Sequence, residues 1–321
     1  MLKKLYRIAL LIGAFFQMEA HENGQKKVAV LCTTQLVADA VKAVAADTVS
    51  IDILIQGEID PHSYQLVKGD ADRIQEAAVV FCNGLNLEHG FSLKQMLSKH
   101  PAVVSLGDAL YEKFPHQILK VDGELDPHVW MDVSLWVETL DVIAKQLALI
   151  LPQHEKLFYS NALEVKQNWI ELDRYIVDRM SAIHENKRYL VTSHDAFNYF
   201  SRRYLATDEE RKDQSWTKRF KAPEGLSPDS QIGPYDIKKI LNHLSRYRIA
   251  VVFAESNVSV ESLKKIIAVA KMQGVKVIFA DEPLFGDSMT GERMKVENYE
   301  ALMRHNCEVI AKYLNTYHPT S

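Results

Sequence analysis

Short apolar runs alternate with helix-like stretches through the first third of the chain. The runs that predict strands are residues 27–32, 49–55, 78–82 and 103–106. Predicted helices stand between them, at residues 35–46, 68–77 and 87–99. A regular strand–helix order is typical of a parallel sheet with helices on its faces.

The second half of the chain repeats this order. Apolar runs predict strands at 188–192, 249–254 and 275–280. Helical spacing or helix start signals predict helices at 197–204, 234–246, 260–272 and 298–314. With 321 residues, the chain suits two domains. We therefore predict an α/β protein with two lobes of parallel-sheet strand–helix units.

A long segment without glycine or proline after Pro152 separates the two halves and runs to His184. Its apolar residues recur at roughly helical spacing, and one helix of this length would measure ~48 Å at 1.5 Å per residue. We predict a rigid helix that joins the lobes and limits hinge motion between them. The alternative is two helices with a bend near Asn168. The expected boundaries are 27–150 for the first lobe, 151–186 for the link and 187–321 for the second lobe.

The N-terminus has the pattern of a secretory signal. Basic residues precede an apolar run at 8–16, and Ala20 precedes a polar segment. We expect residues 1–20 to be removed and the product to be periplasmic, with a buried N-terminal helix as the alternative. No cysteine follows the apolar run, so a lipid anchor is not expected there.

Net charge and cysteine count exclude some classes of protein. The net charge of −4 gives no basic field for nucleic acid. Three cysteines cannot form a complete disulfide framework. Cys32 and Cys82 end predicted strands, so we expect buried thiols without a bridge. The charged run 207–221 is interpreted as a solvated insertion.

Two Asp-Pro-His triplets, at residues 60–62 and 126–128, are candidate parts of a ligand-binding site. Proline fixes φ, so each triplet predicts a stiff turn that can hold one imidazole in a fixed direction. His62 follows the second predicted strand, and His194 follows the strand at 188–192. Ligands of open α/β sheets bind beyond the carboxyl ends of strands.

Three acidic residues also follow predicted strands and are candidates for a further metal ligand: Glu255, Asp281 and Asp287. Imidazoles joined by one carboxylate suit zinc, iron or manganese. Such ligands would converge between the lobes. The residues alone do not decide which acid completes the set.

An enzyme would need a named catalyst. The chain has no G-x-S-x-G, H-E-x-x-H, phosphate loop or G-x-G-x-x-G motif. A secreted metal-dependent hydrolase remains the alternative function, with Glu255 as its general base. Glu255 could equally be a structural acceptor for backbone donors.

An ordered set of motifs resembles the metal-binding solute-binding proteins of ABC importers for zinc, manganese or iron. The motifs are Asp60-Pro61-His62-Ser63-Tyr64, Asp126-Pro127-His128-Val129-Trp130, Thr192-Ser193-His194-Asp195-Ala196-Phe197, Gly225-Leu226-Ser227-Pro228, Phe253-Ala254-Glu255-Ser256 and Leu284-Phe285-Gly286-Asp287-Ser288. The resemblance covers about residues 28–314.

The resemblance implies two lobes joined by a long helix, with a metal site in the cleft between them. It carries the ligands over onto His62, His128, His194 and Asp287. It implies a monomeric receptor rather than an enzyme, one bound transition-metal ion, and delivery to a membrane permease with its ATPase. A third function attributed to relatives is adhesion.

The sequence lacks one feature of the zinc-specific members of this family, and this bears on which metal is bound. Zinc-specific members often carry a histidine-rich loop before the second motif, whereas residues 115–125 contain only His116. Manganese and iron therefore stay open. We expect replacement of Glu255 or Asp281 by alanine to affect binding much less than loss of a ligand.

Overall fold

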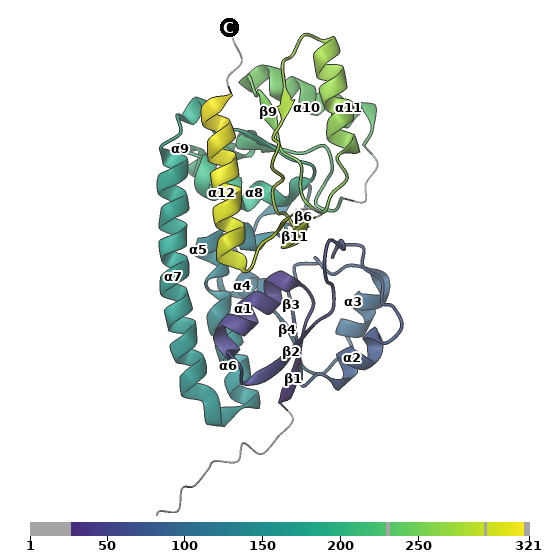
Figure 1. The fold of residues 1–321 in the computed structure, drawn as a ribbon, viewed down its shortest axis with the longest axis vertical. Helices are drawn as coiled ribbons and strands as arrows, with labels where there is room; N and C mark the ends of the chain where they lie inside the picture. The colour runs from purple at the N-terminus through teal and green to yellow at the C-terminus, as the bar shows by residue number, and fades with distance from the viewer. Residues whose placement is uncertain (1–26, 229–231, 292–293, 318–321) are drawn as a thin grey trace, which may run out of the picture.

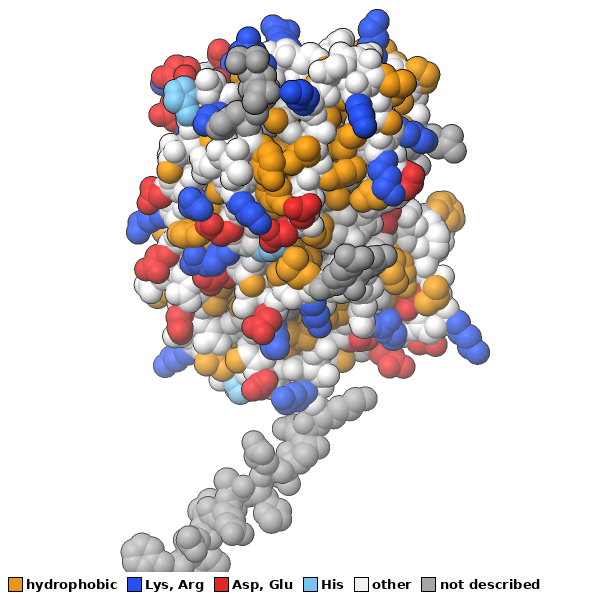
Figure 2. Space-filling view, turned by 45° about the horizontal axis from the view of Figure 1, so that its top comes forward, with side chains coloured by type: hydrophobic (Ala, Val, Ile, Leu, Met, Phe, Trp, Pro, Cys, Tyr) orange, Lys and Arg blue, Asp and Glu red, His pale blue; other side chains and the backbone are white. Residues whose placement is uncertain are grey.

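The computed structural model describes residues 27–228, 232–291 and 294–317, and the predicted signal peptide at 1–20 lies outside them. It has two lobes, one above the other, with the long helix α7 (Glu155–Ser181) running along both (Figure 1). Charged side chains of both signs are spread over the surface (Figure 2). No described helix is long and apolar enough to cross a bilayer.

The first lobe is built on a four-stranded parallel sheet in the order β2-β1-β3-β4. Its strands are β1 (Val28–Cys32), β2 (Val49–Ile53), β3 (Val79–Cys82) and β4 (Val103–Ser105). Its helices are α1 (Gln35–Ala45), α2 (Asp70–Glu76), α3 (Phe91–Leu97) and α4 (Leu106–Lys113). Helix α1 begins at the predicted residue 35, and the Thr34 hydroxyl caps it by accepting a hydrogen bond from the Val37 amide.

The second lobe has shorter strands than the sequence predicts. They are β7 (Leu190–Val191), β8 (Phe220–Lys221), β9 (Val251–Val252) and β10 (Ile278–Phe279). β7 pairs with β8 and β9 with β10, both in parallel. A hydrogen bond from the Phe253 amide to the Val191 carbonyl, 2.9 Å long, ties the two pairs together. The lobe's longer helices are α10 (Pro234–Tyr247), α11 (Glu261–Met272) and α12 (Tyr299–Thr316).

Helix α7 confirms the predicted rigid connection and excludes the bend at Asn168. A 3₁₀ turn, η2 (Pro152–His154), leads directly into it. Its apolar face is buried at Trp169, Leu172 and Ile176, and it packs against α6 (Thr139–Ile150) and α12. Before it, α5 (Val133–Trp136) and α6 are separate helices, and the Thr139 hydroxyl donates a hydrogen bond to the Trp136 carbonyl at the break.

One hydrophobic cluster runs through both lobes, from Val30 in β1 to Leu314 in α12. The start of α12 joins them, since the Tyr299 ring packs 4.6 Å from that of Trp169 on α7. The Tyr299 hydroxyl also donates to the Trp130 carbonyl at 2.6 Å. The two lobes and α7 therefore share one core.

The charged run at 207–221 is not the solvated insertion that its composition suggested. It folds into α9 (Asp208–Lys212), the 3₁₀ helix η6 (Ser215–Arg219) and β8. Trp216 and Arg219 are buried, and the Arg219 guanidinium meets the Glu210 carboxylate at 2.7 Å. Internal charge pairing and the strand pairing of β8 account for the packing.

Smaller elements complete the chain. They are the strands β5 (Lys120–Val121), β6 (Glu124–Leu125), β11 (Thr290–Gly291) and β12 (Met294–Lys295), the 3₁₀ turns η1 (Val129–Met131), η3 (Glu185–Lys187) and η4 (Asp195–Phe197), the short helix α8 (Asn198–Phe200) and the π-helical turn η5 (Ser201–Leu205). Cys32 and Cys82 are buried and free, as predicted, and Cys307 is also buried and free.

Candidate metal centre

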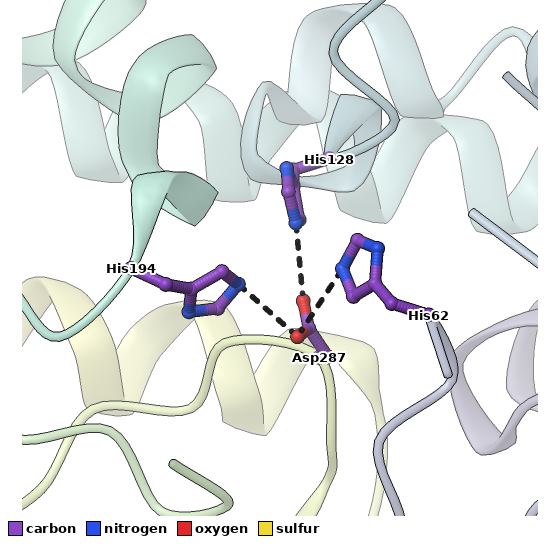
Figure 3. Close-up of side chains that lie close together, drawn as sticks. All are labelled: His62, His128, His194 and Asp287. Carbon is purple, nitrogen blue, oxygen red and sulfur yellow. Dashed lines mark ion pairs between the residues drawn. The ribbon is translucent and has the colours of Figure 1, made fainter. Parts of the chain in front are cut away.

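His62, His128, His194 and Asp287 point toward one another between the lobes (Figure 3). One nitrogen or oxygen of each lies within 4.8 Å of the corresponding atom of every other. His62 lies in the loop after β2, and His128 immediately precedes η1. His194 follows β7, and Asp287 lies in the loop after β10. The structure thus brings together two side chains from each lobe.

The Asp287 carboxylate is the centre of the cluster. Its oxygens lie 3.1 Å from His194 Nε2, 3.3 Å from His128 Nε2 and 3.6 Å from His62 Nε2. All four residues are buried, with His128 and His194 fully excluded from solvent. An ion held by these four buried side chains would be shielded from solvent.

His128 is oriented by the aspartate of its own triplet. Asp126 Oδ1 accepts from both the backbone N–H of His128, at 3.0 Å, and its ring Nδ1, at 2.7 Å. Asn198 donates to the second Asp126 oxygen at 3.1 Å. A proton fixed on Nδ1 leaves the Nε2 lone pair directed at Asp287, which suits metal coordination.

His194 has an equivalent partner from a distant segment. Glu255 Oε2 lies 2.7 Å from His194 Nδ1, and its other oxygen accepts the amides of Ser193 and His194 at 3.0 and 2.9 Å. Glu255 is therefore the structural acceptor that we weighed against a general base. A Cβ on Gly286 would stand only 2.3 Å from Glu255 Oε2, so the loop before Asp287 needs glycine there.

His62 is held through its backbone. Asp60 accepts the His62 amide at 2.9 Å and the Ser63 hydroxyl at 2.6 Å, so the first triplet forms a compact turn. Ser288, next to Asp287, donates to the Gly57 carbonyl at 2.6 Å. This bond ties the loop of His62 to the loop of Asp287 across the lobes.

Burial and the neighbouring charged groups shift the pKa values of the side chains in the cluster. Burial lowers the pKa of His62. Burial also lowers the pKa of His128, but Asp126 and Asp287 outweigh it and raise that pKa to about 9. Burial favours a neutral Asp287, yet the three histidines hold the pKa of its carboxyl well below the usual range. The carboxylate is the anionic ligand that a cation would meet.

Unpartnered polar atoms test whether a metal ion fits. Nε2 of each histidine and both Asp287 oxygens are buried and have no hydrogen-bond partner. Buried polar atoms without partners are costly, so such a group in a folded protein needs an explanation. Three imidazole nitrogens and a carboxylate facing one point fit one borderline divalent or trivalent cation.

The described acidic residues outside the four-residue cluster do not face the point on which the ligands converge. Asp281 is exposed, and its backbone amide donates to the Tyr313 hydroxyl oxygen at 2.7 Å. The orienting contacts of Asp126 and Glu255 were not predicted from the sequence. For Asp126 a signal existed, because an acid two residues before a histidine within a stiff turn can reach its ring.

Fold and cluster together define a bilobed metal-binding protein. Residues 30–313 match the family model described as zinc-uptake complex component A, periplasmic. The metal-binding protein YtgA of Chlamydia trachomatis is 37% identical over 304 residues, covering 95% of this chain and 91% of the relative. The manganese-binding lipoprotein MntA of Bacillus subtilis is 32% identical over 303 residues, covering 92% of each.

A solved structure agrees with these relatives. Fe(III)-bound YtgA from Chlamydia trachomatis superposes with a TM-score of 0.85 at 38% identity, covering 92% of this chain and all of that one. The chain belongs to the zinc-uptake component A family, whose members include substrate-binding proteins of ABC metal importers. The comparisons give no support to the alternative of a secreted hydrolase.

Proposed function

We propose that this protein is a periplasmic receptor that captures one manganese, zinc or iron ion and delivers it to an ABC permease with its ATPase. His62, His128, His194 and Asp287 would be the ligands. The observation that carries this proposal is the set of buried ligand atoms that lack any hydrogen-bond partner and face one another across the lobes.

The ligand set supports a carrier rather than an enzyme. Four protein ligands can close a coordination sphere and leave no open position for a catalytic water. The two carboxylates beside the ligands are already engaged, Glu255 with His194 and two backbone amides and Asp126 with His128. Relatives are named for manganese or were solved with Fe(III), so the ion itself stays open.

The two-lobe arrangement supports delivery. We propose a first lobe at 27–150, a link at 151–186 and a second lobe at 187–321. Because each lobe supplies two of the proposed ligands, the ion would bridge them, and its presence would fix their relative position. A monomer would suffice, since all four groups come from one chain. A permease could then distinguish loaded from empty receptor by shape.

Metal titration tests the site. We expect wild-type protein to bind one equivalent of Mn²⁺ or Zn²⁺ in calorimetry. His62→Ala, His128→Ala and His194→Ala should each lose well over the ~100-fold in affinity that changes around a metal site reach. His116→Ala, an exposed histidine outside the cluster, is the matched control. Wild-type affinity in His62→Ala and His194→Ala would show that the ion binds elsewhere.

Delivery and location need separate tests. Protein recovered from the periplasm should lack residues 1–20, and an intact Met1 would contradict export by cleavage.

Loaded receptor should stimulate ATP hydrolysis by a permease–ATPase complex encoded beside it, whereas the His194→Ala protein should not. Equal stimulation by both proteins would contradict metal-dependent delivery.

A further inference from the structure

A second pocket lies on the second lobe, apart from the metal cluster. It has a volume of about 320 Å³ and is bounded by η6, β8 and α10. None of the four proposed metal ligands contributes to its lining, and no carboxylate does either. Because the whole chain carries a net charge of −4, a lining with four cationic side chains and no carboxylate is a local feature.

The lining is basic. Lys218, Lys221, Lys239 and Arg246 contribute to it from two different segments. Lys218 is neutralised by Glu210 at 2.7 Å. The other three make no ion pair with any described carboxylate. Burial, reinforced by Lys239, lowers the pKa of Lys221, and the more weakly acting carboxylates of Asp195 and Asp122 do not offset this.

A buried histidine adds a second, independent observation. His243 on α10 lines the same pocket, is only 7% exposed, and its Nε2 has no hydrogen-bond partner. Its ring packs at 4.8 Å against Tyr247, which fixes its position. A buried ring nitrogen without a partner needs an explanation. Asn242 supplies a neutral amide in the same lining.

We propose that this pocket binds a small oxyanion of the phosphate type. Three cations that form no ion pair with a described carboxylate supply the attraction, and lysine ammonium groups are established phosphate donors. The pocket volume suits a small tetrahedral anion with its hydration water rather than a polymer. The same chemistry is met by free inorganic phosphate and by the phosphate of an anionic lipid headgroup.

The test uses the mature full chain at low ionic strength. Inorganic phosphate is titrated and followed by calorimetry and by amide chemical shifts. Wild-type protein should bind saturably, with shifts centred on residues 217–221 and 239–247. Lys221→Ala and Lys239→Ala should each bind phosphate about tenfold more weakly, because each loses one charge-assisted hydrogen bond. Lys264→Ala, on α11 of the same lobe and paired with Glu261, is the matched control.

Vesicles identify the source of the phosphate. Co-sedimentation with phosphatidylglycerol but not phosphatidylcholine, lost in Lys221→Ala, would assign the site to a headgroup. Saturable binding of inorganic phosphate without co-sedimentation would assign it to the free anion. Mn²⁺ titration of each variant verifies that it is folded. Absence of both kinds of binding in wild-type protein, or wild-type phosphate affinity in both lysine variants, would overturn the proposal.

Discussion

His194 and Glu255 form a buried pair in which Nδ1 of the imidazole lies 2.7 Å from a carboxylate oxygen. The same carboxylate holds the backbone of residues 193 and 194 through its other oxygen. One side chain thus fixes both the position and the ring orientation of a proposed ligand. His128 has the same support from Asp126, whereas the described contact that holds His62 from its own loop is its backbone amide donating to Asp60.

This pair revises the expectation that Glu255 matters little. Glu255→Ala should weaken Mn²⁺ and Zn²⁺ binding by about 10–100-fold, the usual effect of removing a group that orients a metal ligand. Glu255→Gln keeps an acceptor for the backbone amides and should lose less. Calorimetry on both variants measures this, with Asp281→Ala as the exposed acidic control. Equal losses in Asp281→Ala and Glu255→Ala would refute a specific role for Glu255.

Asp287 should discriminate between ions. Asp287→Ala removes the only anionic ligand of the proposed set and leaves three imidazoles. Mn²⁺ prefers oxygen ligands more strongly than Zn²⁺ does, so Mn²⁺ affinity should fall further. Titrating the variant with both ions measures the difference. A larger loss for Zn²⁺ than for Mn²⁺ would be the opposite of this expectation.

Gly286→Ala should disturb the site without removing any ligand. The added methyl would meet Glu255 Oε2 at 2.3 Å, so the loop or the Glu255–His194 pair must shift. We expect a loss of about 1–3 kcal/mol in unfolding free energy, typical of overpacking, together with weaker metal binding. Gly225→Ala is the control, because its Cβ would meet nothing within 4 Å. Urea unfolding and metal titration measure the two effects.

Glu210 should give the 207–221 segment a pH-dependent stability. Burial would raise its pKa, but Arg219 and Lys218 outweigh this and lower the pKa from 4.5 to about 2. A lowered carboxyl pKa stabilises the fold above 4.5, and this contribution disappears as the pH falls toward 2. Glu210→Gln should therefore cost about 1–3 kcal/mol at pH 7. The difference from wild type should shrink at pH 3, measured by urea unfolding.

Helix α7 offers a matched pair for testing its buried face. Leu172 is fully buried, whereas Leu163 on the same helix is 60% exposed. Leu172→Ala should lower the unfolding free energy by about 2–5 kcal/mol. Leu163→Ala should change it by no more than about 0.5 kcal/mol. Chemical denaturation compares them, and similar losses in the two variants would mean that α7 is packed differently.

The sequence predicted most of the first lobe, α7 and the three histidines. These features have strong local signals: alternating strand–helix periodicity, a long segment without glycine or proline, and proline-stiffened turns before His62 and His128. The choice of Asp287 over Asp281 came from the family resemblance. The structure is consistent with it, since Asp281 is exposed while Asp287 lies among the histidines.

Features set by distant partners could not be predicted. The pairing of Glu210 with Arg219 turns a charged run into packed structure, and no local pattern reports that pairing. Glu255 reaches His194 from 61 residues away in the chain. In both cases a tertiary contact overrides what the local sequence favours.

The free cysteines have a consequence for how the protein handles metal. Thiolates are strong ligands for zinc, and an accessible one would compete for the cargo. Here burial raises the pKa of Cys32 and Cys82, and of Cys307 to about 12, so all three stay protonated at neutral pH. Folding also requires no sulfur oxidation. Buried, protonated thiols are poor metal ligands, so the three cysteines are poorly placed to compete with the cleft for a metal ion.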